Sequence, residues 1–349
     1  MKAILFALPL SLLPLACASG GSEPVQAPPP PPPAPAAPPA AAAPEPAEPA
    51  PTAEEVAAAE AAQRQQAEWQ QMEAAAQAEQ ARFTPELRQE VQALANTKWE
   101  TSRAGLQKIL SSNHRRPGHA ARDPFRHPLE TLEFFGLKPT MSVLEYGPGE
   151  GWYTELLAPL LAQRGSLAVT VTDPNGPRED RSTFYGRRTQ LMLDKSPELF
   201  GKVDRVVVDG KQPSLDAEGK YDLVLVIRGM HGWARQGKTA TWLGEIHQAL
   251  KPGGVLGVVQ HRAAAGADPQ TSAEGGYLPE AWVIEQVQAA GFKLQAKSEV
   301  NANPKDTKDH PDGVWSLPPT LRQGDVDRAK YEAIGESDRM TLKFVKTAK

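Results

Sequence analysis

Residues 143–154 read Val-Leu-Glu-Tyr-Gly-Pro-Gly-Glu-Gly-Trp-Tyr-Thr. An apolar run ends in an acid, Glu145, and three glycines then alternate with other residues: Gly147, Gly149 and Gly151. Glycines allow the main chain to turn sharply and a ligand to approach it closely. The free N–H groups at the start of the following helix favour a carboxylate or a phosphate. We therefore expect a strand, a ligand-binding turn and a helix, in that order.

The spacing of these glycines separates them from the dinucleotide-binding fingerprint. That fingerprint has the order Gly-x-Gly-x-x-Gly, whereas the sixth position counted from Gly147 is Trp152. A tight strand–helix turn without a ligand, as any α/β protein can contain, is the alternative to a binding loop.

The region from about residue 117 onward alternates between strand-like and helix-like segments. Apolar runs predict seven strands, at residues 142–146, 167–172, 203–208, 221–227, 255–259, 292–300 and 340–345. Helical spacing predicts helices between several of them, at residues 152–163, 182–193, 242–250 and 279–290. The alternation indicates a doubly wound α/β sheet, in which ligands bind beyond the carboxyl ends of the strands.

Two acids stand at the ends of neighbouring strands in this scheme. Asp173 follows the second strand about twenty residues past the glycines, where an acid can accept hydrogen bonds from ribose hydroxyls. Asp209 follows the third strand, and we expect it within reach of an adenine amine. Both also open turn sequences, Asp-Pro-Asn-Gly and Asp-Gly, so a purely structural turn role stays open for each.

A histidine and an arginine follow each of the next two strands. Arg228 and His231 follow the fourth strand, and His261 and Arg262 follow the fifth. A neutral imidazole accepts a proton near pH 7, and a guanidinium binds carboxylates and phosphates. The two histidines are therefore candidate catalytic bases, and the two arginines are candidate substrate-binding residues. A structural histidine is the alternative for His231.

The N-terminus has the pattern of an export signal. Lys2 precedes an apolar run at residues 3–15 that is too short to span a membrane. Cys17, the only cysteine of the chain, ends this run and resembles the lipidated cysteine of a bacterial lipobox. We expect residues 1–16 to be a lipoprotein signal peptide and Cys17 to hold the exported chain at a membrane of the cell envelope or periplasm. An ordinary signal peptide is the alternative.

The next two segments differ sharply in composition. Residues 17–52 are mostly Pro and Ala, which predicts an extended, disordered tether; a docking site for Pro-reading partners is the alternative. Residues 53–82 are rich in Ala, Gln and Glu with few large apolar side chains, which predicts a solvated helix; weak packing, or pairing with another chain, is the alternative. Thr84-Pro85 opens another helix, and we take residues 84–349 as the main domain with a helical N-terminal extension.

The region from about Arg122 to Phe344 resembles a family of predicted, exported bacterial class I S-adenosylmethionine-dependent methyltransferases. The resemblance rests on residues 122–128, 145–159, 228–233, 251–254, 261–262, 301–306, 313–319 and 334–340, including Lys-Pro-Gly-Gly, Gly-Val-Trp-Ser-Leu-Pro-Pro and Ile-Gly-Glu-Ser-Asp-Arg-Met. It implies the class I methyltransferase (Rossmann-like) fold. In that fold a doubly wound, seven-stranded sheet is mostly parallel with an antiparallel last strand, here with added N-terminal helices.

The resemblance also implies S-adenosylmethionine as the cofactor. The three glycines would hold its methionine end, with Glu145 near the ammonium group. Asp173 would bind the ribose and Asp209 the adenine. The histidines would then deprotonate a methyl acceptor, which we expect to be a small molecule or a component of the cell envelope.

A long insert separates the last two predicted strands. Residues 301–338 are rich in polar groups and single aromatics, and inserts of this length are usually functional. We expect this insert to cover the substrate, with Asn303 and Trp315 in contact with it. Asp306-x-x-Asp309-His310 has no completing ligands at a recognisable spacing, so we expect no metal site.

Composition and motifs exclude several other classes. The net charge is −4 and the basic residues are scattered, which argues against nucleic acid as a partner. The chain lacks a nucleophile elbow and a His-Glu-x-x-His motif. We expect an envelope-anchored methyltransferase with an unknown acceptor. The rival is a non-catalytic lipoprotein that uses the same fold to bind a ligand or partner, since S-adenosylmethionine is made in the cytoplasm.

Overall fold

The computed structural model describes residues 29–33 and 52–347. The chain divides into two units, Met1–Thr52 and Ala53–Lys349. In the first unit, residues 29–33 are exposed and belong to no helix or strand. The predicted signal peptide, Cys17 and most of the predicted tether lie outside the described residues. Within the described ranges, every helix is too short or too polar to cross a membrane.

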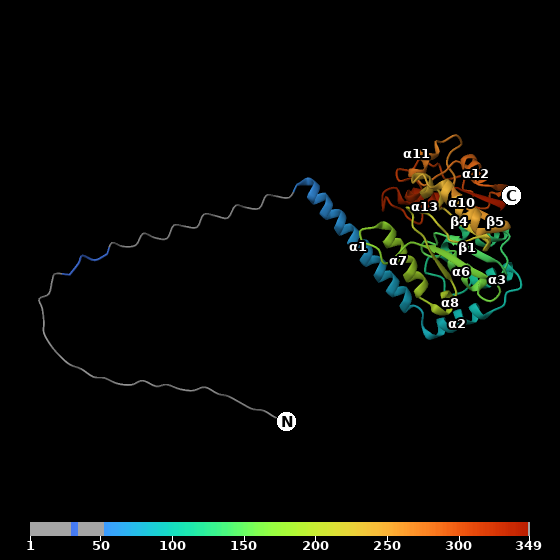
Figure 1. Ribbon diagram of the computed structural model, residues 1–349, viewed down its shortest axis with the longest axis horizontal. Coiled ribbons are helices and arrows are strands. Elements are labelled where there is room, and N and C mark those ends of the chain that lie inside the picture. Colours follow the sequence, from blue (N-terminus) through green and yellow to red (C-terminus); the bar gives the residue numbers. More distant parts are fainter. Residues whose placement is uncertain (1–28, 34–51, 348–349) are drawn as a thin grey trace, which may run out of the picture. The chain divides into compact units, whose positions relative to one another are not determined.

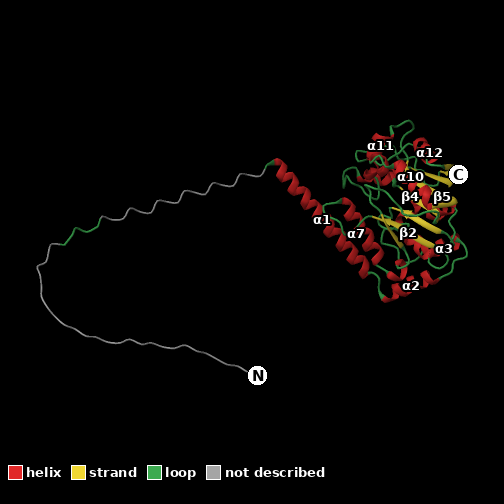
Figure 2. Cartoon of the chain, in the orientation of Figure 1, coloured by secondary structure: helices red, strands yellow, loops and turns green. Residues whose placement is uncertain are grey.

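The second unit is built around one seven-stranded sheet, whose strands are yellow in Figure 2. Its spatial order is β3-β2-β1-β4-β5-β7-β6. The strands are β1 (Ser142–Tyr146), β2 (Ser166–Val171), β3 (Asp204–Val207), β4 (Tyr221–Ile227), β5 (Leu250–His261), β6 (Phe292–Ser298) and β7 (Arg339–Lys346). The first five pair in parallel, and β7 runs antiparallel to both neighbours. The fold class predicted from the sequence is confirmed.

The two faces of the sheet bury separate apolar clusters because successive side chains of a strand point to opposite faces. Val143 of β1 belongs to one cluster, which also receives α2 (Pro85–Asn96), α3 (Ser102–Leu110), α5 (Pro128–Phe135) and α6 (Thr154–Leu161). Leu144 belongs to the other cluster, which receives α9 (Met230–Arg235), α10 (Thr239–Ala249) and α12 (Glu280–Ala289). Helices therefore cover both faces, as buried parallel strands require.

The predicted solvated helix at residues 53–82 is observed as α1 (Ala53–Ala81), but one face of it packs on the domain. It lies along α7 (Arg181–Asp194), as Figure 1 shows. Trp69 is buried, its indole nitrogen donates a hydrogen bond to the Arg178 carbonyl at 3.2 Å, and its ring meets Phe184 edge-on. One buried aromatic therefore fixes a helix whose other side chains are mostly exposed.

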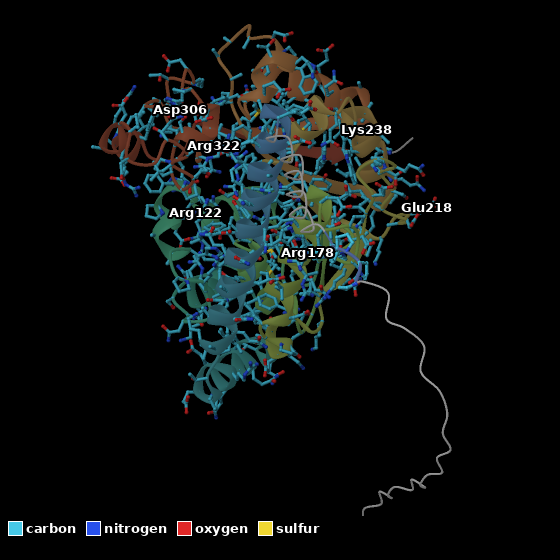
Figure 3. The ribbon with its side chains drawn as sticks, turned by 90° about the vertical axis from the view of Figure 1, so that its left-hand side faces the viewer. Arg122, Arg178, Glu218, Lys238, Asp306 and Arg322 are labelled. Atoms are coloured by element: carbon cyan, nitrogen blue, oxygen red, sulfur yellow. The ribbon has the colours of Figure 1, made fainter. Side chains whose placement is uncertain are left out.

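The predicted insert between β6 and β7 contains little regular structure. It holds a short 3-10 turn (Gly313–Ser316) and α13 (Arg328–Ile334). Figure 3 shows this insert, which carries Asp306 and Arg322, beside the segment of Arg122. That segment comprises a 3-10 turn (Ala120–Arg122) and α4 (Asp123–Arg126). The remaining helices are α8 (Pro197–Phe200) and α11 (Pro269–Glu274).

Candidate active site at the carboxyl ends of the strands

A cavity of about 790 Å³ lies where the sequence predicts it, beyond the carboxyl ends of β1, β2, β4 and β5. The turn between β1 and α6, the side of α7 and the insert complete its walls. The strand ends and α7 thus contribute regular structure to the wall, and the glycine turn and the insert contribute irregular segments.

The glycine turn presents bare main chain to this cavity. Gly147 and Gly149 line it, both have φ of +61°, and nothing lies within 4 Å of where a Cβ would stand. A side chain there would be strained and would occupy the open space. The Gly147 N–H donates to Thr170 Oγ1 at 2.8 Å, which ties the turn to β2. The predicted binding loop is thus shaped to admit a ligand.

The third glycine of the motif serves packing. Gly151 has φ of +82°, and a Cβ on it would stand 2.6 Å from Met192 Sδ. It does not line the cavity. Gly151 therefore packs against Met192 of α7 and is not part of the cavity wall. Its contact with the cofactor stays a prediction.

Glu145 lies behind the glycine turn. Its side chain is buried, and Oε2 accepts a hydrogen bond from Thr154 Oγ1 at 2.7 Å. Burial raises the pKa of Glu145 to about 7, although the hydrogen bond and the charge of Arg228 act in the opposite direction. A cationic group placed beside this carboxyl would stabilise its ionised form.

Both predicted nucleotide-binding acids take part in turns. Asp173 Oδ1 accepts a hydrogen bond from the Asn175 N–H at 2.9 Å, and Asp209 Oδ1 accepts one from the Lys211 N–H at 2.7 Å. Both side chains are exposed and neither lines the cavity, although their predecessors Thr172 and Val208 do. The turn role left open from the sequence is the one observed, and their contacts with ribose and adenine stay predictions.

The two predicted bases meet in the cavity. The rings of His231 and His261 both line it, with centroids 6.0 Å apart. His261 Nδ1 lies 2.5 Å from Ser337 Oγ, and His231 Nδ1 lies 3.4 Å from Gln260 Nε2. Burial and neighbouring positive charge lower the pKa of His231 to about 4 and hold the pKa of His261 well below its usual range. Both imidazoles are therefore neutral at pH 7.

The predicted substrate-binding residues divide into two groups. Arg228 and Trp315 line the cavity, and the Trp315 ring meets the His231 ring at 5.9 Å. Arg262 and Asn303 do not line it. Arg262 Nη2 lies 2.6 Å from Glu299 Oε2, and Asn303 Nδ2 donates to the Ile334 and Glu336 carbonyls at 2.9 and 2.6 Å. Arg262 thus pairs with an acid, and Asn303 shapes the segment that carries Glu336.

Glu336 is a functional candidate that the sequence analysis missed. Its buried carboxylate receives Arg122 Nε at 2.9 Å, Arg126 Nε at 3.0 Å and Arg339 Nη1 at 2.8 Å. Arg228 Nη1 lies 3.9 Å away. The family-like segments at residues 122–128 and 334–340 contain three of these partners, but no periodicity in the sequence pairs segments so far apart.

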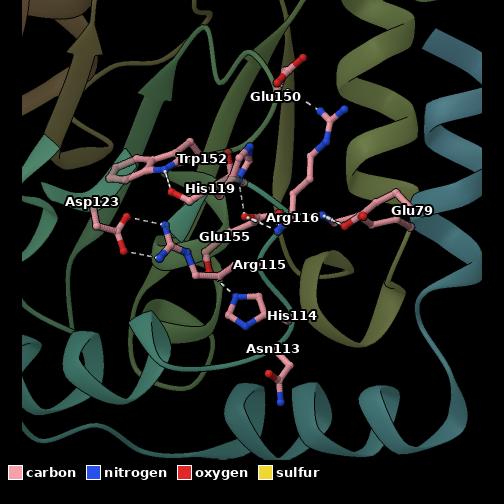
Figure 4. Close-up of polar contacts among 12 residues, drawn as sticks. Glu79, Asn113, His114, Arg115, Arg116, His119, Asp123, Glu150, Trp152 and Glu155 are labelled. Atoms are coloured by element: carbon pink, nitrogen blue, oxygen red, sulfur yellow. Dashed lines mark hydrogen bonds and ion pairs between the residues drawn. The ribbon is translucent and has the colours of Figure 1, made fainter. Parts of the chain in front are cut away.

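Glu155 is a second buried carboxylate next to the glycine turn, and Figure 4 shows the polar contacts around it. Glu155 of α6 accepts from His119 Nδ1 at 2.7 Å, Lys195 Nζ at 2.6 Å and the Arg116 N–H at 3.1 Å. Burial alone would raise its pKa, but the His119 hydrogen bond and the Lys195 charge lower the pKa of Glu155 to about 2. Trp152 Nε1 donates to the His119 carbonyl, which connects this network to the cavity wall.

Asp306 and His310 of the insert are held by contacts within the fold. Asp306 is buried and accepts from Tyr277 Oη at 3.1 Å and from His310 Nε2 at 2.9 Å. In the described part of the chain, no group of three or more His, Cys, Asp or Glu side chains is arranged to hold a metal ion. These residues fasten the insert to the strand region.

Comparison with known proteins places the chain among methyltransferases. A family model described as a methyltransferase domain matches residues 114–297. A SAM-dependent methyltransferase from Aquifex aeolicus is 16% identical over 71% of this chain and 99% of its own, with a TM-score of 0.41. The N-methyltransferase NodS from Bradyrhizobium japonicum WM9 is 18% identical over 65% of this chain and 97% of its own, with a TM-score of 0.39. A search of curated proteins found no match.

Proposed function

The chain belongs to the methyltransferase domain family, and we propose that it methylates an acceptor at the cell envelope with S-adenosylmethionine as the cofactor. When bound, this cofactor supplies an electrophilic methyl group, whose bond to sulfur breaks as the acceptor atom bonds to carbon and both electrons stay on sulfur. The chain's own residues have to bind and orient the two reactants and take up the acceptor's proton.

The observation that carries the proposal is the open glycine turn backed by a buried carboxyl. The space above Gly147 and Gly149 admits the methionine end of the cofactor against the main chain. Glu145 does not line the cavity but lies buried behind this turn, so it would act on an ammonium group there through its charge. The bare main chain of the turn therefore fits the methionine end of the cofactor.

The histidines hold or move the acceptor's proton. In the tautomer in which His261 Nδ1–H donates to Ser337 Oγ, the other ring nitrogen is free to accept a proton. Because burial and nearby arginines weaken this base, its strength depends on what else the cavity holds. An added negative charge beside it would raise its affinity for a proton.

The envelope location rests on the N-terminal sequence alone. The export-like segment at residues 1–16 and the single Cys17 support a lipid anchor, and the Pro/Ala-rich segment supports a spacer between anchor and domain. Labelling of cells with a radioactive fatty acid tests it: the chain should take up label, and Cys17→Ser should abolish the uptake. Unlabelled wild-type chain would exclude the lipid anchor.

Ligand-dependent unfolding tests the cofactor. S-adenosylhomocysteine at about a hundred times its dissociation constant should stabilise the chain by ~2.7 kcal/mol. The absence of any shift with S-adenosylmethionine or S-adenosylhomocysteine would leave the non-catalytic binding module as the better account. A shift without labelled methyl transfer to envelope extracts would support the same module with the cofactor retained.

A further inference from the structure

The cavity carries more positive charge than its own acids offset. Five arginines line it: Arg122, Arg126, Arg188, Arg228 and Arg235. Among the described residues, Glu150 and Glu336 are the only carboxylates on its wall, and Glu150 already pairs with Arg116 at 3.2 Å. Arg235 has Glu274 at 4.0 Å, so Glu336 is the wall carboxylate shared by Arg122, Arg126 and, at 3.9 Å, Arg228.

We propose that the methyl acceptor carries an oxyanion, a phosphate or carboxylate group, that binds to Arg122, Arg126 and Arg228 in this cavity. This inference rests on the proposed methyl transfer and adds the chemical class of its substrate. The guanidinium group is suited to such a ligand because it offers two parallel N–H donors to phosphate or carboxylate oxygens.

Each of the three arginines has hydrogen-bonding capacity left over. Arg126 is 2% exposed, uses Nε for Glu336, and has a buried Nη1 with no partner in the described residues. Arg122 uses Nε for the same carboxylate. The Arg228 guanidinium makes no side-chain hydrogen bond within the described ranges, and its nearest acid is 3.9 Å away. A buried donor such as Arg126 Nη1 is costly when it remains unpaired, whereas Arg122 and Arg228 are partly exposed toward the cavity.

Arg228 is also held in an unusual backbone conformation. Its φ is +58°, in the left-handed region that residues other than Gly seldom adopt. Its N–H donates to the Val259 carbonyl at 2.6 Å, which ties the strained residue to β5. Such strain concentrates at functional sites because the surrounding structure has to maintain it.

The cofactor cannot supply the missing negative charge. S-adenosylmethionine has one carboxylate but two cationic groups, its ammonium and its sulfonium, so it increases the positive surplus. Its one carboxylate can offset at most one of the arginines on the wall. An additional anion is therefore the ligand that balances the cavity, and bound near His261 it would strengthen that base.

The test measures binding of two kinds of probe to the full chain in detergent by isothermal titration calorimetry. One probe is S-adenosylhomocysteine, and the others are inorganic phosphate, glycerol 3-phosphate and succinate. The variants are Arg228→Gln and Arg122→Gln. Arg205→Gln is the matched control, because Arg205 pairs with Asp194 away from the cavity wall.

We expect glycerol 3-phosphate or succinate to bind together with S-adenosylhomocysteine. Each cavity variant should weaken the anion at least tenfold and S-adenosylhomocysteine less than threefold, and the control should change neither. Loss of S-adenosylhomocysteine binding to the same extent, or competition between the two probes, would assign the arginines to the cofactor's carboxylate and overturn the inference.

Two further results separate this inference from the proposed function. Normal S-adenosylhomocysteine binding with no binding of any anion would overturn the anionic acceptor and leave methyl transfer standing. Anion binding without S-adenosylhomocysteine binding would overturn methyl transfer, and with it the assignment of the anion as an acceptor. Vesicles of phosphatidic acid, compared with soluble glycerol 3-phosphate, identify a lipid headgroup or a free small molecule as the source of the phosphate.

Discussion

Arg126 and Glu336 are 210 positions apart in the chain, yet Arg126 Nε lies 3.0 Å from Glu336 Oε2 at the wall of the cavity. One residue belongs to the helical segment before the sheet, and the other to the insert before its last strand in the sequence. Both residues line the cavity, and the Arg126 guanidinium also lies over the Trp152 ring at 4.9 Å. The site is therefore completed by segments outside the β/α core.

Gly149→Ala should weaken S-adenosylhomocysteine at least tenfold, because a Cβ would occupy the space left open for the ligand. Gly253→Ala is the matched control: Gly253 also has positive φ and open surroundings, and lies outside the cavity wall. Both variants should lose about 1–2 kcal/mol of stability from left-handed strain, as urea unfolding would measure. Equal ligand affinities in the two variants would contradict a ligand at this turn.

Glu145→Gln should make the free chain more stable at pH 8 and weaken its cofactor binding. The pKa of Glu145 is about 7 in the folded state and 4.5 for an unperturbed carboxyl. The folded state therefore binds more protons between these two pH values, and the wild type loses stability as pH rises through that window. The wild type loses up to about 3 kcal/mol of its free energy of unfolding over this pH range. The variant has no ionisable group at this position and should not show this loss. Urea unfolding from pH 4 to 8 would show this, and parallel pH profiles would contradict it.

Glu336→Gln should destabilise the chain by about 3–5 kcal/mol, because it leaves buried arginines without their shared carboxylate. Glu332→Gln, which removes an exposed pair with Arg328, should change stability by less than about 1 kcal/mol. Thermal unfolding compares the two. Added phosphate should stabilise Glu336→Gln if an anion can replace the carboxylate, and the absence of both effects would contradict the charge balance derived for the cavity.

Glu155→Gln should lower stability by about 3–5 kcal/mol at pH 7 and much less at pH 3. The folded pKa of Glu155 is depressed to about 2 from 4.5, so its contribution is present above pH 4.5 and is lost as pH falls toward 2. Urea midpoints at the two pH values measure the difference. Glu130→Gln, at an exposed side chain of α5, is the control and should change stability at pH 7 by less than about 1 kcal/mol.

Asp173→Asn should distinguish the two roles of this acid. Asparagine can still accept the Asn175 N–H, so the turn and the melting temperature should be preserved. If the carboxylate binds ribose hydroxyls, S-adenosylhomocysteine should bind about tenfold more weakly, since hydrogen bonds to a charged acceptor contribute about 1.5–3 kcal/mol. Unchanged affinity in calorimetry would leave Asp173 with the turn alone.

Local patterns were sufficient for the architecture. Each of the seven strands predicted from apolar runs overlaps an observed strand. The parallel strands β2 and β4 are largely apolar because both of their faces are buried, whereas β3 is mostly exposed and β6 alternates. The direction of the chain then fixes the edge of the sheet at which the parallel strands end. His231 and His261 follow two neighbouring strands, so they meet at that edge. The alternating glycines marked the turn, since positive φ with an open approach leaves few other choices of residue.

Side-chain partners depended on the tertiary structure. The same motif contains Gly149, which faces open space, and Gly151, which packs on Met192, and sequence spacing cannot separate them. Arg228 and Arg262 each directly follow a parallel strand. Acids from other segments pair closely with Arg262, whereas Glu336 lies 3.9 Å from the Arg228 guanidinium.

The sequence by itself therefore determined the sheet, its ligand-binding edge and the residues that the strands deliver there. Only the tertiary structure decided which charges remain uncompensated at that edge. The physical reason is that periodicity and turn chemistry act over a few residues, whereas the balance of charge in a buried cavity is set by groups hundreds of positions apart, such as Arg126 and Glu336.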